Sequence, residues 1–306
     1  MRRGIVMVCL SSVAYGFMPL FTTACYRMGL DVVSTTFWRF SLVVPMLLLL
    51  GKGFHVDMRL RPRYAARLCV RVGIPSGLTM FLLNIAYASI DVGLATTIHF
   101  LYPVTVVILA SLVYHDHITP SVRWAIALIV LGMLVLSGGI SLRGDGMGVL
   151  CAAASALSYA VYLLQLDHGG FSGLSPVVTA LCTAATNSVL MLLVSCFVAP
   201  IQVPGTVSQM CATIGLSGLS LLALYCLAAG TRVLMSHYVA VFGLLEPVAS
   251  VACGAVFLGE EINATKLAGM LIVAVAIVLV ALEGRISQAG RVHACNGNSP
   301  DIRTSC

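Results

Sequence analysis

Charged residues are scarce in this sequence: Asp, Glu, Lys and Arg make up 9% of its 306 residues, whereas hydrophobic residues make up 59%. A soluble domain carries about 25% charged residues. A water-soluble fold of this composition would have too few charged side chains to cover its surface. The composition therefore predicts an integral membrane protein. Its apolar runs lack the alternation of apolar and polar residues that transmembrane strands need, so an all-α fold is expected.

Several sequence motifs are also missing. The chain has no GxxxxGK[ST] phosphate-binding loop, so it is not expected to hydrolyse ATP. Its 11 cysteines are scattered without CxxC spacing and are predicted to be small apolar fillers, with no metal site and no cofactor. The net charge of +6 lies in the connecting segments, which makes it a feature of topology and gives no reason to expect a nucleic-acid partner.

Hydropathy predicts ten transmembrane helices, because each apolar run approaches the roughly 20 residues that cross a bilayer. The expected spans are 4–27, 32–50, 69–90, 92–114, 120–140, 147–166, 175–199, 209–230, 234–258 and 264–283. Residues 284–306 are polar and rich in Gly, Ser and Asn, and are predicted to form a disordered cytoplasmic tail.

The basic residues predict the orientation of the helices. With both termini in the cytoplasm, the inner side collects the basic segment 52–71, and the outer side keeps only Arg27, Arg143 and Lys266. Basic residues concentrate on the cytoplasmic side of membrane proteins. A multi-pass protein of the inner (plasma) membrane is therefore expected, with the lipid bilayer as its environment.

The chain repeats itself at an ungapped offset of about 144 residues. The matching pairs include Gly4 with Gly148, Ser11 with Ser155, Tyr15 with Tyr159, Gly29 with Gly173, Thr35 with Thr179 and Pro103 with Pro247. Residues 1–144 and 145–283 thus form two predicted units of five spans each. Because five is odd, the second unit enters the membrane from the opposite side, and such inverted repeats are characteristic of secondary transporters.

Three stretches of sequence carry a family resemblance. They are LLEPVASVACGAVFLGEEI at 244–262, its echo YASIDVGLATTIHFLYPVTVVILASLVYHDHIT at 87–119, and the opening SVAYGFMPLF with FWRF at 37–40. The chain resembles the EamA-like, ten-helix branch of the drug/metabolite transporter superfamily. This resemblance implies a central cavity lined by helices 3, 4, 8 and 9, in a family whose members move amino acids and other small metabolites, often outward. Tyr15 stands where the family usually has tryptophan, and His115-Asp116-His117 where a glycine-glutamate pair is usual.

Glu246 is the only acidic residue of the span expected at 234–258 and lies about 18 Å from each of its ends. A carboxylate at this depth is costly unless it is paired or faces water. It is either a cavity acid that contacts an ammonium group or carries a coupling proton, or a packing residue tied to backbone groups that Pro247 frees. Tyr238 is predicted on the same helix face.

Tyr102 is the repeat mate of Glu246, and His99 lies one turn earlier on the same predicted face. Their hydroxyl and imidazole suit hydrogen bonding to a substrate, and a histidine can also exchange protons near neutral pH. Glu246 and His99 are therefore the two candidate coupling residues. The alternative for His99 is a hydrogen bond between helices. Pro103 and Pro247 are expected to interrupt their helices.

Four further polar residues are expected within the spans. Asn84, Tyr87 and Tyr225 are candidate substrate contacts, although each could equally join two helices. Arg39 lies about 10 Å into its span and, being permanently charged, is predicted to be a structural anchor that needs a carboxylate, backbone carbonyls or water. The lack of clustered arginines argues against phosphorylated solutes.

The sequence as a whole predicts a secondary transporter that moves small polar or zwitterionic metabolites, amino acids or their relatives, outward by alternating access. Protons are a candidate second partner, and a monomer or weak dimer is expected. A vitamin or nucleoside carrier is the nearest alternative. A membrane-embedded enzyme is the alternative of another class, resting on His115-Asp116-His117, which is otherwise predicted to be a solvated connection between helices.

Overall fold

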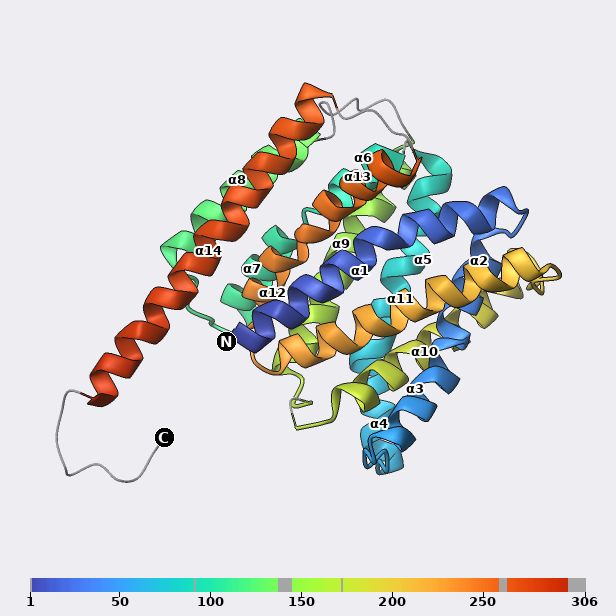
Figure 1. Cartoon of the computed structure of the whole chain (residues 1–306), viewed down its shortest axis with the longest axis horizontal. Coiled ribbons are helices and arrows are strands. Elements are labelled where there is room, and N and C mark those ends of the chain that lie inside the picture. The colour runs from blue at the N-terminus through green and yellow to red at the C-terminus, as the bar shows by residue number, and fades with distance from the viewer. Residues whose placement is uncertain (1, 91, 137–144, 172, 259–262, 297–306) are drawn as a thin grey trace.

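The computed structural model describes residues 2–90, 92–136, 145–171, 173–258 and 263–296, and within these ranges it is helical without strands. The first repeat contains α1 (Arg2–Arg27), α2 (Val32–Ser41), α3 (Val43–Gly53), α4 (Pro62–Leu68), the π-helical turn η1 (Cys69–Gly73), α5 (Ile74–Ser89), α6 (Val92–His99), α7 (Tyr102–Val113) and α8 (Pro120–Leu136). The second contains α9 (Gly146–His168), α10 (Pro176–Ser195), α11 (Val207–Thr231), α12 (Ser236–Gly243), α13 (Leu245–Leu258) and α14 (Ala264–Asn296) (Figure 1).

These elements form the ten predicted spans. Nine stretches of the described chain are long and apolar enough to cross a membrane, and the tenth, Pro120–Leu136, is a shorter apolar helix. The predicted end of that span, at residue 140, lies outside the described residues. We number the spans in chain order: α2 with α3 makes span 2, α4 through α5 makes span 3, α6 with α7 makes span 4, and α12 with α13 makes span 9.

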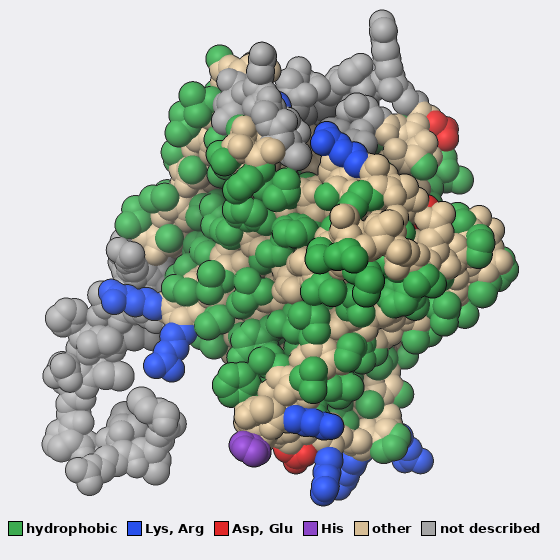
Figure 2. All heavy atoms as spheres, turned by 45° about the vertical axis from the view of Figure 1, so that its right-hand side comes forward, with side chains coloured by type: hydrophobic (Ala, Val, Ile, Leu, Met, Phe, Trp, Pro, Cys, Tyr) green, Lys and Arg blue, Asp and Glu red, His purple; other side chains and the backbone are tan. Residues whose placement is uncertain are grey.

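The surface agrees with a membrane environment. Many large hydrophobic side chains are exposed, among them Leu49, Leu112, Val189 and Val275. Figure 2 shows a face on which hydrophobic side chains predominate, with Lys and Arg gathered toward its lower end. Exposed apolar area of this extent would be unusual on a soluble monomer. The chain is thus a multi-pass membrane protein, as predicted.

Local sequence signals explain several helix starts. Asp31 caps α2 by accepting from the backbone N–H of Ser34 at 2.8 Å. Thr206 and Gln209 form a reciprocal capping box at the start of α11. Both α4 and α10 begin at a proline, which is favoured in the first turn because its missing N–H would have no partner there in any case.

The packing of the helices repeats the internal symmetry of the sequence. Span 1 packs against span 8 (α1 on α11), and its repeat mate, span 6, packs against span 3 (α9 on α5). Span 1 also packs against span 9 through α13, and span 6 against span 4 through α7. Spans 5 and 10, which are mates of each other, lie side by side as α8 and α14 (Figure 1). The two five-span repeats thus make equivalent contacts.

Spans 4 and 9 are both broken, and at matching places. Span 4 is interrupted between His99 and Tyr102, and span 9 at Leu244, in each case shortly before the proline that the repeat aligns. Proline cannot donate to the carbonyl four residues back, and its ring crowds that carbonyl. The prediction that Pro103 and Pro247 interrupt their helices is therefore confirmed.

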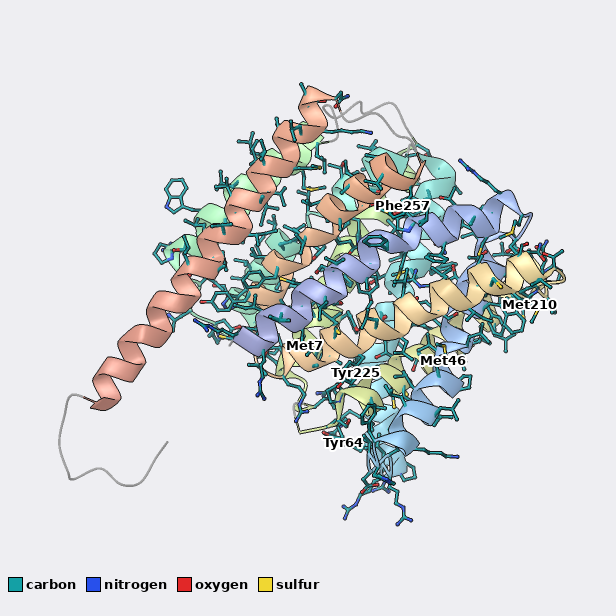
Figure 3. The ribbon with its side chains drawn as sticks, in the orientation of Figure 1. Met7, Met46, Tyr64, Met210, Tyr225 and Phe257 are labelled. Atoms are coloured by element: carbon teal, nitrogen blue, oxygen red, sulfur yellow. The ribbon has the colours of Figure 1, made fainter. Side chains whose placement is uncertain are left out.

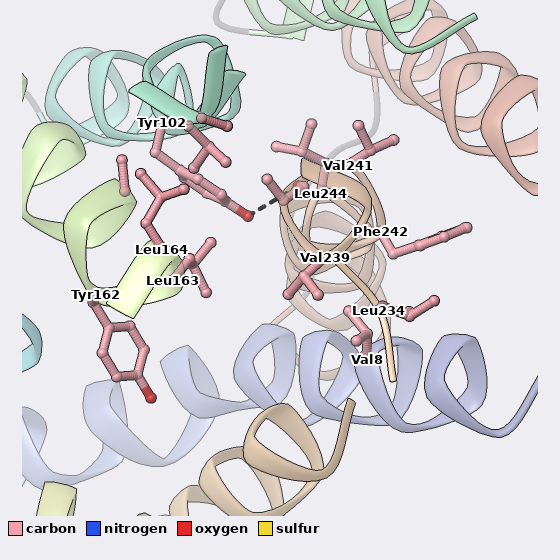
Figure 4. Close-up of a cluster of buried hydrophobic side chains, with 14 of the residues drawn as sticks. Val8, Tyr102, Tyr162, Leu163, Leu164, Leu234, Val239, Val241, Phe242 and Leu244 are labelled. Atoms are coloured by element: carbon pink, nitrogen blue, oxygen red, sulfur yellow. Dashed lines mark hydrogen bonds between the residues drawn. The ribbon is translucent and has the colours of Figure 1, made fainter. Parts of the chain in front are cut away.

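The second break leaves one carbonyl that needs a new partner. The backbone N–H of Leu244 turns to the carbonyls of Val241 and Phe242, so it no longer donates to Ala240. The hydroxyl of Tyr102 donates to the Ala240 oxygen at 3.3 Å instead, reaching across from the other repeat (Figure 4). In the first repeat the equivalent carbonyl, that of Thr96, keeps its helical bond from Phe100 at 2.9 Å.

Gly16 sets the distance between spans 1 and 9. A Cβ atom at this position would lie 2.5 Å from the Ala249 Cβ and 2.8 Å from the backbone oxygen of Glu246. Only a glycine allows α1 to rest directly on the first turns of α13. The neighbouring residue, Tyr15, interacts electrostatically with Glu246.

The C-terminal region differs from its prediction. Helix α14 does not end near residue 283 but continues to Asn296, so the predicted tail 284–306 begins as helix. Residues 297–306 lie outside the described part of the chain.

The inverted repeat makes a prediction for Arg59 and Val203, which are repeat mates and are both exposed. Cysteines introduced as Arg59→Cys and Val203→Cys should react with a membrane-impermeant maleimide from opposite sides of the membrane. Labelling of the unmodified protein, which has exposed Cys196 and Cys211, is subtracted as background. Labelling of both positions from one side would contradict the inverted topology.

We expect Gly16→Ala to lower the stability of the protein in detergent by about 1–3 kcal/mol, because the added methyl group overpacks the contact with α13. Gly218→Ala is the matched control: this glycine also lies in a helix, but a Cβ there would have no neighbour within 4 Å. Thermal unfolding of the two variants measures the difference. Equal melting temperatures would show that the close approach at Gly16 is not required.

Candidate functional site

Glu246 lies in the first turn of α13, just after the break in span 9 and about 15 Å from either end of that span. Its side chain is half-buried. It makes no hydrogen bond within the part of the chain that the structure describes. A carboxylate in the middle of a membrane domain therefore remains available for a partner.

Polar and aromatic groups from five other spans lie within electrostatic range of this carboxylate. Glu246 lies close enough to each of them for an electrostatic interaction. They are Tyr15 on α1, Arg39 on α2, Tyr87 on α5, Tyr102 on α7 and Tyr159 on α9. Glu246 thus faces the interior of the bundle, where spans of both repeats converge.

Arg39 supplies a positive charge to this cluster. Its Nε donates to the Ser220 hydroxyl at 2.8 Å, and its guanidinium lies over the rings of Phe40, at 5.0 Å, and Tyr15, at 6.0 Å. These contacts hold the side chain in place, as an anchoring role would require. Arg39 is half-buried, and no further hydrogen bond from its guanidinium occurs among the described residues.

The two opposite charges do not neutralise each other directly. Among the described residues, the ion pairs join His168 to Asp116 and to Asp167. None joins Arg39 to Glu246, so these two side chains are too far apart to form an ion pair. The centroid of the Tyr15 ring lies 6.0 Å from the guanidinium carbon, and Tyr15 also interacts electrostatically with Glu246. The site thus contains a cation, an anion and a tyrosine that is near both.

His99 is held by a neighbouring span. Its Nδ1 lies 3.0 Å from the Ser155 hydroxyl, which itself donates to the Ala152 carbonyl at 2.7 Å. The serine therefore accepts, and His99 carries its proton on Nδ1. The ring also lies within 6 Å of the rings of Tyr102 and Tyr159. His99 packs and orients the aromatic wall of the site.

The other predicted site residues are distributed unevenly. Tyr87 contacts the Thr96 hydroxyl at 3.3 Å and belongs to the group around Glu246. Asn84, one turn before it on α5, is half-buried and has no hydrogen bond within the described residues. It is therefore free to contact a solute.

Tyr225 and Tyr238 differ in their surroundings. Tyr225, on α11 (Figure 3), packs in a separate cluster with residues of α2, α3 and α10. Tyr238 lies with its ring 4.5 Å from that of His237. The predicted stripe that joined Tyr238 to Glu246 assumed one continuous helix, and the break at Leu244 interrupts it.

Three members of the site, Tyr15, Tyr159 and Ser220, were not among the predicted site residues. Tyr159 lies 4.6 Å from Tyr102, ring to ring, and Ser220 holds Arg39. The sequence repeat indicated Tyr159, because Tyr159 is the repeat mate of Tyr15 just as Tyr102 is the repeat mate of Glu246. No sequence pattern distinguished Ser220 from the other serines of α11.

A separate pocket of about 420 Å³ opens between the ends of α1 and α11 that lie near Arg27 and Ser208. Apolar groups dominate its lining, and it includes none of the residues around Glu246. We therefore do not assign it to the site.

The tripeptide His115-Asp116-His117 is only partly a solvated connection. His115 and His117 are exposed, as predicted, but Asp116 points inward and lies 3.2 Å from Nε2 of His168.

Comparison with known proteins agrees with this architecture. A solved crystal structure superimposes with a TM-score of 0.78 at 18% sequence identity, covering 92% of this chain and 97% of the other. At this identity the likeness shows the fold alone. No curated protein matches the chain. The model of the EamA-like transporter family matches twice, over residues 2–138 and 146–282, which are the two repeats. The chain therefore belongs to the EamA-like transporter family, whose members are membrane transporters.

Proposed function

We propose that this protein is a secondary transporter of small zwitterionic metabolites, amino acids or their relatives, which it moves out of the cytoplasm by alternating access. The observation that carries the proposal is the presence of Arg39 and Glu246 in one site, near enough to interact electrostatically but without an ion pair between them. An amino acid carries one carboxylate and one ammonium group. The carboxylate would pair with Arg39, and the ammonium group with Glu246.

The energetic argument rests on desolvation. A buried charge without a partner costs on the order of several kcal/mol. The guanidinium of Arg39 is already fixed through Nε, so its remaining N–H groups can bind a carboxylate with little loss of side-chain freedom. Glu246 can bind the ammonium group, and the tyrosine rings next to it offer faces that attract cations. A solute with only one charge would leave the other residue unpaired.

The symmetry of the fold supports the transport cycle. The site lies where spans of both repeats meet, and the two repeats make equivalent contacts. In an inverted-repeat carrier, exchange of the two arrangements opens the central site to each side of the membrane in turn. Broken helices at the site are also usual in such carriers, because the freed backbone groups lie within the protein.

We propose Glu246 as the residue that carries a coupling proton. His99 is the weaker candidate, because its Nδ1 is occupied by Ser155 and its ring is packed among tyrosines. The proposed location is the inner membrane of a bacterium, with both termini in the cytoplasm.

Proton coupling can be tested in proteoliposomes. For the unmodified protein, a pH gradient should change the flux of a transported amino acid several-fold; for Glu246→Gln, flux should no longer respond to the gradient, because the amide cannot exchange a proton. His99→Gln is the comparison and should keep the response. Equal flux with and without the gradient in all three proteins would remove Glu246 from coupling.

The assignment of the two charges can be tested with truncated ligands. The amine analogue of a bound amino acid, which lacks the carboxylate, should bind Arg39→Gln about as well as it binds the unmodified protein. The carboxylic acid analogue should likewise be insensitive to Glu246→Gln.

The full amino acid should lose roughly tenfold or more in affinity for each variant, since each removes a charge-assisted hydrogen bond of about 1.5–3 kcal/mol. Titration calorimetry or a thermal-shift assay in detergent measures these affinities. If both analogues respond to both substitutions alike, the two residues do not divide the zwitterion between them. If vitamins or nucleosides bind and amino acids do not, the solute class is wrong.

A further inference from the structure

A second polar cluster lies at the end of the bundle where α7 and α9 finish and α12 begins. Asp116 follows α7, and Asp167 and His168 form the end of α9. Nε2 of His168 lies 3.2 Å from Oδ1 of Asp116, and its Nδ1 lies 3.5 Å from Oδ2 of Asp167. Each of the three residues offers one potential ligand atom, and these three atoms lie within 4.8 Å of one another.

The cluster contains more hydrogen-bond acceptors than hydrogen-bond donors. Asp116 has a side chain that is only 9% exposed, and its buried Oδ2 has no hydrogen-bond partner. Nδ1 of His168 and Oε1 of Gln165, one turn earlier on α9, are also buried without a partner. Buried polar atoms of native proteins are almost always satisfied, so these atoms indicate a missing cation.

We propose that Asp116, Asp167 and His168 bind a divalent transition-metal ion of the Zn²⁺ type. Carboxylate oxygen and imidazole nitrogen together suit such ions, whereas Mg²⁺ and Ca²⁺ prefer oxygen alone. Zinc bonds of about 2.0 Å in a tetrahedral arrangement place neighbouring ligand atoms about 3.3 Å apart. The 3.2 Å between Nε2 of His168 and Oδ1 of Asp116 fits this spacing.

Neighbouring residues fix the orientation of these ligands. Oδ2 of Asp167 accepts the backbone N–H of Ser236 at 2.6 Å. The ring of Tyr114 stacks on that of His168 at 4.1 Å, and the Tyr114 hydroxyl accepts from Gln165 at 3.1 Å. Such outer contacts set the orientation of ligands in metal sites. Oε1 of Gln165 or a water molecule can complete the coordination.

The competing account is an imidazolium ion held between two carboxylates without metal. It would satisfy both ring nitrogens of His168, but Oδ2 of Asp116 would still lack a partner. A metal ion bound through both oxygens of Asp116 would give that Oδ2 a partner, and Zn²⁺ titration distinguishes the two accounts.

The test uses full-length protein, free of histidine tags and stripped of metal, in detergent. Titration with Zn²⁺ should show about one ion bound per chain, and Co²⁺ should give the visible absorption of a low-coordinate site. Asp116→Asn and His168→Gln should each weaken Zn²⁺ binding by more than about tenfold, since changes even to outer contacts of zinc sites cost 10–100-fold.

The controls are the exposed imidazoles on either side of Asp116. His117→Ala and His115→Asn should leave Zn²⁺ affinity unchanged; asparagine is chosen at His115 because the backbone there has a φ of 56°, which asparagine tolerates. A melting curve without metal confirms that each variant is folded. Zinc affinity that is absent, or that survives both Asp116→Asn and His168→Gln, would overturn the proposal. Because the readout is binding, it is independent of whether the protein carries amino acids.

Discussion

Lipid offers no hydrogen-bond partner, and this constraint shapes the centre of the molecule. Spans 4 and 9 are broken near their middle, at Phe100–Leu101 and at Leu244. The carbonyl that the second break releases is satisfied by a side chain of the other repeat, through the bond from Tyr102 to Ala240. The irregular backbone is thus compatible with a membrane only because the two repeats pack against each other there. The same packing encloses the charged groups that form the candidate site.

The site draws its chemistry from residues that are individually unfavourable in a membrane. Arg39 and Glu246 each need compensation, and the protein gives it in part: a serine and aromatic rings for the guanidinium, and the positive charge of Arg39 for the carboxylate. Partial compensation keeps both side chains in defined positions while leaving binding capacity unused. A transporter needs this balance, because a fully satisfied site would bind nothing and an unsatisfied one would destabilise the fold.

Much of the fold could be predicted from the sequence, because membrane spans and repeats leave linear signals. The ten spans follow from runs of apolar residues, and the matching breaks follow from Pro103 and Pro247 in one ungapped register. The position of Glu246 at the centre of a span follows in the same way. Helix α14, by contrast, continues beyond its apolar run, since polar residues can extend a helix outside the membrane.

The partners within the site could be predicted only in part, because they depend on tertiary contacts. The bond from Arg39 to Ser220 joins residues 181 positions apart, and α11 contains several serines of equivalent appearance. Asp116 was predicted to be solvated because its partner, His168, is about 50 residues away in the sequence. Tyr238 was predicted on the helix face of Glu246, and the break in span 9 interrupts that face; Tyr225 packs with residues of α2, α3 and α10, which no linear pattern indicated.

The two halves of the molecule are related but not equivalent at their breaks. Tyr102 crosses to the Ala240 carbonyl, while its mate Glu246 makes no reciprocal bond, and the corresponding carbonyl of Thr96 remains within its own helix. In the proposed alternating-access cycle, identical halves would make the inward-facing and outward-facing forms equally stable in the absence of a gradient. Because the bond from Tyr102 to Ala240 has no counterpart in the first repeat, the two proposed forms would differ in stability, and the carrier would rest facing one side of the membrane.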